Sequence, residues 1–135
     1  MNKTIIYSSN EIQIYIDNDK YILYVDIIDG TYNNNFKDAV EYYKNFWILI
    51  NESDTKYYQV FLFNNVKLYP LEFYEIIFKT LKSLEKIYEK NLYSSCLVND
   101  SNAIDILKPL LNMYKAVRPF NFVKDLDEGY KFLGI

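Results

Sequence analysis

Apolar and polar residues alternate near the start of the chain, and this spacing predicts β-strands. In Glu11 to Ile16 the isoleucines occupy every second position, which is typical of a strand at or near a sheet edge with one solvated side. The turn-forming residues Asp17 to Lys20 come next. Tyr21 to Ile28 is then an almost continuous apolar run that ends at Asp29-Gly30. We interpret the two runs as a β-hairpin whose second strand is buried.

Helical spacing, with apolar residues three and four positions apart, follows the hairpin. It runs from Phe36 to Ile50 and predicts a helix with one face against the sheet. A second helix is expected to begin at Pro70, which suits a first helical turn, and to continue to about Lys90.

Two more helices are expected in the last third of the chain. Asp100 to Asn102 offers caps for a helix from Ile104 to Tyr114, and Pro109 either bends this helix or marks a later start. Asp125 followed three residues later by Glu128 is an N-terminal capping arrangement, and it predicts a closing helix. The apolar residues on one face of that helix are Leu126, Tyr130 and Leu133.

Between the helices lie β-rich runs at Tyr57 to Phe63, Leu92 to Val98 and Phe120 to Val123. Because helices separate these strands, we expect them to be parallel, and the scarcity of polar residues in the first places it centrally. The order of elements predicts an α/β fold: a mixed, mostly parallel sheet with an N-terminal β-hairpin and about four helices. We expect a single domain over residues 1–135.

Composition narrows the class of protein. With 50% hydrophobic and 19% aromatic residues in 135, the chain can build a core without disulfides or metal. A net charge of −3 leaves no electrostatic footprint for nucleic acid, so we expect none as a partner. No apolar run approaches the roughly 18 residues that span a bilayer. Met1 to Tyr7 also lacks a basic segment followed by a long apolar stretch, so we expect a cytoplasmic protein.

The 15 tyrosines accompany many Asn, Ile and Lys residues, all encoded by AT-rich codons. This bias is typical of the genome of a large DNA virus, a protist or an AT-rich microbe. We attribute the tyrosines to that bias, and the alternative is an adhesive surface for a partner.

Catalytic chemistry is sparse in the sequence. The chain has no histidine, which excludes Ser-His and Cys-His nucleophile pairs and imidazole metal ligands. Gly30 alone follows a strand, so no phosphate-binding loop can be drawn, and Cys96 in a β-rich run is expected to be a buried structural residue. We therefore expect no enzyme and no cofactor.

A metal site is an alternative that the carboxylates allow. Asp26 and Asp29 end a buried strand, where open α/β sheets place ligands, and Asp54 or Asp100 would complete the ligands of a hard cation. The other interpretation is that Asp29-Gly30 only makes a turn.

The loop from Asn64 to Leu71 leaves the central strand and enters a helix N-terminus, whose unpaired N–H groups suit an anion or a partner loop. The alternative is a connecting loop with a tyrosine packed beneath it. We take as candidate partner-binding residues Asn65, Lys67, Tyr69, Glu72 and Phe73.

The closing stretch Phe120 to Leu133, together with Ile104 to Tyr114 before it, resembles the ending of STAS domains. This is the fold of bacterial anti-sigma-factor antagonists and of the cytoplasmic parts of sulfate transporters. The resemblance implies that the loop after the central strand docks a partner protein. The family's phosphorylatable serine has no counterpart here, where the chain reads Lys67-Leu68-Tyr69-Pro70-Leu71, so the resemblance implies docking without a serine switch.

Sequence alone therefore predicts a non-enzymatic, regulatory protein-interaction module that contacts its partner between Asn65 and about Ile77, with a homodimer also possible. The alternatives are a small-ligand or lipid pocket between sheet and helices, as in Sec14-like domains, and a carboxylate- and metal-dependent enzyme.

Overall fold

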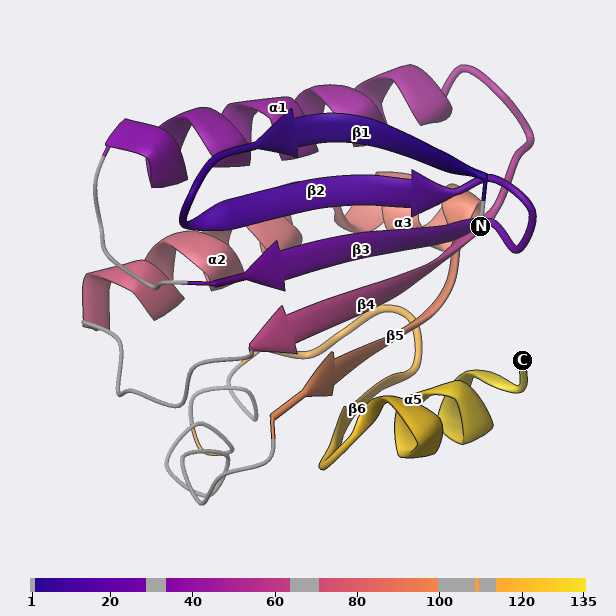
Figure 1. Ribbon diagram of the computed structural model, residues 1–135. Helices are drawn as coiled ribbons and strands as arrows, with labels where there is room; N and C mark the ends of the chain where they lie inside the picture. Colours follow the sequence, from indigo (N-terminus) through magenta and orange to yellow (C-terminus); the bar gives the residue numbers. More distant parts are fainter. Residues whose placement is uncertain (1, 29–33, 64–70, 100–108, 110–113) are drawn as a thin grey trace.

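The computed structural model describes residues 2–28, 34–63, 71–99, 109 and 114–135, and Figure 1 shows their arrangement. The strands are β1 (Lys3–Ser8), β2 (Ile12–Asp17), β3 (Ile22–Ile27), β4 (Tyr57–Phe63), β5 (Leu92–Val98) and β6 (Phe120–Val123). The helices are α1 (Asn34–Ile50), α2 (Leu71–Ser83), α3 (Glu85–Asn91) and α5 (Leu126–Leu133).

The described strands form one sheet whose spatial order is the order of the sequence, β1-β2-β3-β4-β5-β6. Strand β2 pairs antiparallel with both β1 and β3, whereas the pairs from β3 to β6 are parallel. The predicted α/β fold with an N-terminal hairpin and a mostly parallel sheet is confirmed. In general, a right-handed crossover between neighbouring parallel strands places its helix on a face set by the direction in which strands are added. Here the direction stays the same, so the rule places successive crossover helices on the same face of the sheet.

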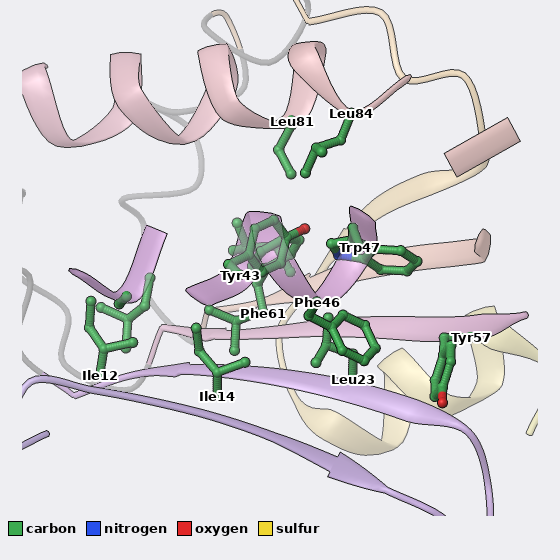
Figure 2. Packing of buried hydrophobic residues seen from close by; sticks show 14 of the residues in the cluster. Ile12, Ile14, Leu23, Tyr43, Phe46, Trp47, Tyr57, Phe61, Leu81 and Leu84 are labelled. Atoms are coloured by element: carbon green, nitrogen blue, oxygen red, sulfur yellow. The ribbon is translucent and has the colours of Figure 1, made fainter. Parts of the chain in front are cut away.

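The two faces of the sheet are covered unequally. On the helix-covered face, Ile14, Leu23 and Phe61 meet Trp47 of α1 and Leu81 of α2 in the main core (Figure 2). Of the described helices, only α5 lies on the opposite face, which we call the open face, and it packs mainly on β5 and β6 (Figure 1). The antiparallel half of the open face therefore has little cover from the described helices.

Helix α5 begins as the capping pattern predicts. The side chain of Asp125 accepts a hydrogen bond of 2.8 Å from the backbone N–H of Glu128, while the Glu128 carboxylate accepts one of 3.0 Å from the N–H of Lys124. Gly129 then brings the helix close to the sheet, since a Cβ there would lie 3.0 Å from the Cys96 Sγ atom.

One strand was not predicted, one predicted helix is wrong, and another predicted helix lies mostly outside the described residues. The edge strand β1 was not predicted. The expected single helix from Pro70 to about Lys90 is wrong, because it breaks at Leu84: Ser83 Oγ donates to the carbonyl of Thr80, and Leu84 N–H donates to Leu81 in a tighter turn. The helix expected from Ile104 to Tyr114 lies mostly outside the described residues.

We expect Gly129→Ala to lower the free energy of unfolding, because the new methyl group meets Cys96 at 3.0 Å and this outweighs the better helix propensity of alanine. In a Cys96→Ala background the same substitution should cost less, with a coupling of about 0.5–1 kcal/mol. Urea denaturation of the four proteins measures this coupling. Equal costs in both backgrounds would show that the two residues do not press on each other.

Candidate functional site

Only two of the candidate partner-binding residues can be placed. Asn65, Lys67 and Tyr69 lie outside the described residues. Glu72 is exposed in the first turn of α2, and Phe73 beside it is fully buried. The Phe73 ring packs against Phe36 at a centroid distance of 4.6 Å, so it anchors α2 to the core and offers no side-chain surface to a partner.

The exposed side of α2 is charged. The exposed charged residues are Glu72, Glu75, Lys79 and Lys82, whereas the apolar residues of the helix from Phe73 to Leu81 are buried or half-buried against the main core. The described part of the predicted contact surface is thus a polar helix face, with acidic residues near its N-terminus and basic residues near its C-terminus, as the helix dipole favours.

The two described carboxylates of the proposed metal site, Asp26 and Asp54, do not lie close together. Asp26 lies near the carboxyl end of β3, while Asp54 precedes the amino end of the parallel neighbour β4. The two therefore lie at opposite ends of the sheet, and Asp54 is instead 3.9 Å from the ammonium of Lys90. Asp29 and Asp100 lie outside the described residues, and the part of the chain that is described holds no group of three potential metal ligands.

The thiol of Cys96 has the environment of a structural residue. It is fully buried between β5 and α5, and burial raises its pKa to about 12. A nucleophilic cysteine needs the opposite shift, toward the thiolate near neutral pH.

A buried hydrogen-bonded cluster joins helices α1 and α3 to the sheet. The hydroxyl of Tyr43 donates to the side-chain oxygen of Gln59 and lies 2.7 Å from the hydroxyl of Tyr88, while the Gln59 amide donates to Ser95 Oγ at 3.1 Å. Burial raises the pKa of both tyrosines above the ordinary value, so they stay neutral hydrogen-bonding groups. This cluster connects α1, β4, α3 and β5 and has the properties of a structural network.

A small apolar cavity lies between the sheet and helices α1 and α2. Its volume is about 40 Å³, and Ile14, Val25, Tyr43 and Ile77 are among the residues that line it. Ligand pockets of proteins usually hold roughly 300–1,000 Å³. Among the described residues, this cavity has room for only a few atoms.

The open face carries an arrangement that sequence reasoning missed. Tyr58 and Tyr93 stack on neighbouring strands with ring centroids 4.8 Å apart, and Tyr15 and Tyr24 stack at 5.0 Å. The hydroxyl of Tyr24 lies 2.6 Å from that of Tyr130 in α5. Tyrosines that are scattered along the sequence thus gather on one surface.

Beside the first of these stacks lies an open groove of about 500 Å³ at the amino ends of β4 and β5. It combines aromatic rings with two lysines, Lys20 and Lys56, and the ammonium of Lys56 lies 5.5 Å from the centre of the Tyr93 ring. We call it the tyrosine groove, and its lining residues are Lys20, Tyr21, Asp54, Thr55, Lys56, Tyr58 and Tyr93.

Tyr21 enters the groove from a strained backbone. Its φ of +57° lies in the left-handed region, where glycine and asparagine are the usual residues and a bulky side chain costs about 1–2 kcal/mol. The preceding turn is held by Asp17, whose carboxylate accepts from the backbone N–H groups of Asp19 and Lys20. This turn holds a half-exposed tyrosine at the rim of the groove.

Comparison with known proteins adds no family to these observations. No family model matches the chain, and no curated protein and no solved structure matches it. The STAS resemblance therefore stays a prediction. No helix within the described ranges is long and apolar enough to cross a membrane.

We expect the Cys96 thiol of the native protein to resist alkylation by iodoacetamide near neutral pH, because it is buried and its pKa is raised to about 12. Mass spectrometry of the labelled protein measures this, with urea-unfolded protein as the control that reacts at once. Labelling of the native protein at the rate of the unfolded one would contradict the assignment.

We expect the Tyr43→Phe variant to lose about 1–3 kcal/mol of unfolding free energy, because it leaves the buried oxygen of Gln59 without its donor. Stability from a raised tyrosine pKa is complete below the unfolded value near 10.0 and is lost as the pH rises toward the folded value. The melting temperature of the wild type should therefore fall steeply as the pH rises above 10.0, the ordinary tyrosine pKa. The melting temperature of the variant should fall less steeply over the same range.

Tyr42→Phe is the matched control for this experiment, since Tyr42 is the exposed neighbour of Tyr43 on α1. It should follow the wild type at every pH. The structural assignment of the cluster is wrong if the two variants show the same dependence of melting temperature on pH.

Proposed function

We propose that this chain is a non-enzymatic protein-interaction module. The observation that carries the proposal is that the potentially reactive groups of the described residues are buried, whereas large aromatic and charged side chains are exposed. The thiol and the tyrosine cluster of the interior are buried and held neutral, whereas large aromatic and charged side chains lie exposed on the open face and on α2. Exposed tyrosines are the kind of side chain that anchors protein interfaces.

For the contact surface we retain the region after the central strand β4, which includes the exposed start of α2. Two things support this choice: the carboxyl ends of parallel strands are the usual ligand side of an α/β sheet, and α2 is fixed there by the buried Phe73. A helix start held rigidly against the core provides a preformed surface that loses little entropy when a partner binds.

The lipid-binding alternative has less support. The cavity between sheet and helices measures about 40 Å³ among the described residues, well below the several hundred that a small ligand fills. The metal-enzyme alternative loses its convergent carboxylates, because Asp26 and Asp54 lie at opposite ends of the sheet.

Affinity purification from the native source, with Glu72→Lys compared with the wild type, tests the proposal. Reversing an exposed charge at the start of α2 should reduce recovery of a partner severalfold, because it replaces an attraction by a repulsion of similar size. Asp127→Lys is the matched control, since Asp127 is exposed in the first turn of α5 and has the same relation to its helix dipole.

The partner should be recovered equally by the control and the wild type. If the Glu72→Lys and Asp127→Lys variants recover the same proteins in the same amounts, the start of α2 is not the contact surface.

A further inference from the structure

We propose that the tyrosine groove is a second binding site, independent of α2, and that it takes an acidic peptide segment of a partner protein. The site lies at the amino ends of β4 and β5, whereas α2 begins beyond the carboxyl end of β4. The two surfaces are therefore at opposite ends of the parallel strands. Failure of one of them in an experiment says nothing about the other.

The charge of the groove favours an anionic occupant. Lys20 and Lys56 are exposed, and within the described part of the chain neither has a carboxylate in ion-pair contact. The acidic residue of the groove, Asp54, lies 3.9 Å from Lys90 outside it. The Asp17 carboxylate just before the turn is occupied by two backbone N–H groups. Both ammonium groups are thus without a carboxylate in direct contact, and Lys20 also lies 6.0 Å from the centre of the Tyr130 ring. The charges of Asp17 and Asp54 remain nearby, so the attraction for an anion comes from the two lysine head groups themselves.

The aromatic rings favour a ligand that also has apolar side chains. Tyr21 and Tyr93 are 49% and 47% exposed, and Tyr58, which also lines the groove, stacks on Tyr93. Rigid tyrosines of this kind give a large contact area with little loss of side-chain freedom on binding. Lysines next to tyrosine rings in an open groove suit carboxylates that flank an apolar residue.

The strained backbone of Tyr21 supports a functional role for its ring. Glycine or asparagine would relieve a φ of +57°, and yet a half-exposed tyrosine occupies the position. Its ring contacts Tyr57, a residue of the main core, edge-on at a centroid distance of 5.7 Å and still remains 49% exposed. Because this contact leaves half of the ring exposed beside the groove, the strain supports a binding role for the exposed part.

A peptide fits better than a nucleic acid because of the overall charge of the chain. The net charge is −3, so a polyanion longer than the groove would extend over an acidic molecule and be repelled. A short segment with two or three carboxylates meets the lysines of the groove and little else.

Selection of short random peptides displayed on phage against the full chain tests the proposal. We expect the selected peptides to be enriched in aspartate and glutamate next to apolar residues, and their binding to weaken as salt is raised. Fluorescence anisotropy of one selected, labelled peptide should show about fivefold weaker binding for Lys56→Glu and for Lys20→Glu, as expected for exposed charge pairs. Tyr93→Ala should weaken it about tenfold or more.

Two variants separate binding from folding. Lys86→Glu makes the same charge change on the exposed side of α3 and should bind the peptide as the wild type does. Tyr21→Gly should weaken binding while leaving the melting temperature equal or higher, because it removes the ring and relieves the backbone.

Selected peptides without acidic enrichment would overturn the proposal, and so would equal binding by Lys56→Glu and Lys86→Glu. An oligothymidylate that binds more tightly than the peptides, and loses affinity in Lys56→Glu, would assign the groove to nucleic acid and overturn it as well. None of these outcomes depends on the partner captured through α2.

Discussion

The strict sequential order of the parallel strands is the constraint on which the rest of this molecule depends. Since the parallel strands from β3 to β6 are added in the same direction, right-handed connections bring the described crossover helices α1, α2 and α3 to the same face. That face becomes the main core, with Trp47 and Leu81 packed on the strands. The other face receives only the closing helix α5 among the described elements, so it stays partly open and displays its tyrosines. Both proposed binding surfaces follow from this asymmetry.

The parts of the fold that the sequence predicts best are those where burial is strong and regular. Strands β5 and β6 begin and end where the apolar runs do, and α5 follows its capping residues. Strand β1 escaped prediction because four of its six residues are exposed and a bulge between Ile5 and Tyr7 interrupts the alternation. The break at Leu84 was not predicted because this leucine continues the helical spacing and is buried like Leu81 and Tyr88 on the same face of the predicted helix. The signal for the break is the hydroxyl of Ser83.

The candidate sites show the limits of sequence reasoning more clearly. Phe73 was predicted at a contact surface because it follows the loop, and the fold turns its ring inward. The tyrosine groove draws residues from the turn after β2, the segment before β4 and the start of β5, which are more than thirty positions apart along the chain. No local motif marks such a set, and a compositional explanation of the tyrosines concealed it. The left-handed backbone of Tyr21 has no sequence signal either, because glycine and asparagine are the residues that usually mark this conformation.

The buried cluster around Gln59 has a consequence for how this aromatic-rich core keeps one arrangement. Rings of similar size can exchange places or slide past one another at small energetic cost, so hydrophobicity alone leaves several packings of α1 and α3 close in energy. An amide that must meet Tyr43 on one side and Ser95 on the other removes that degeneracy, because every shifted packing leaves a polar group dry and unpaired. Substitutions should therefore be tolerated more freely among the apolar contacts of the interior than at this glutamine and its two hydroxyl neighbours.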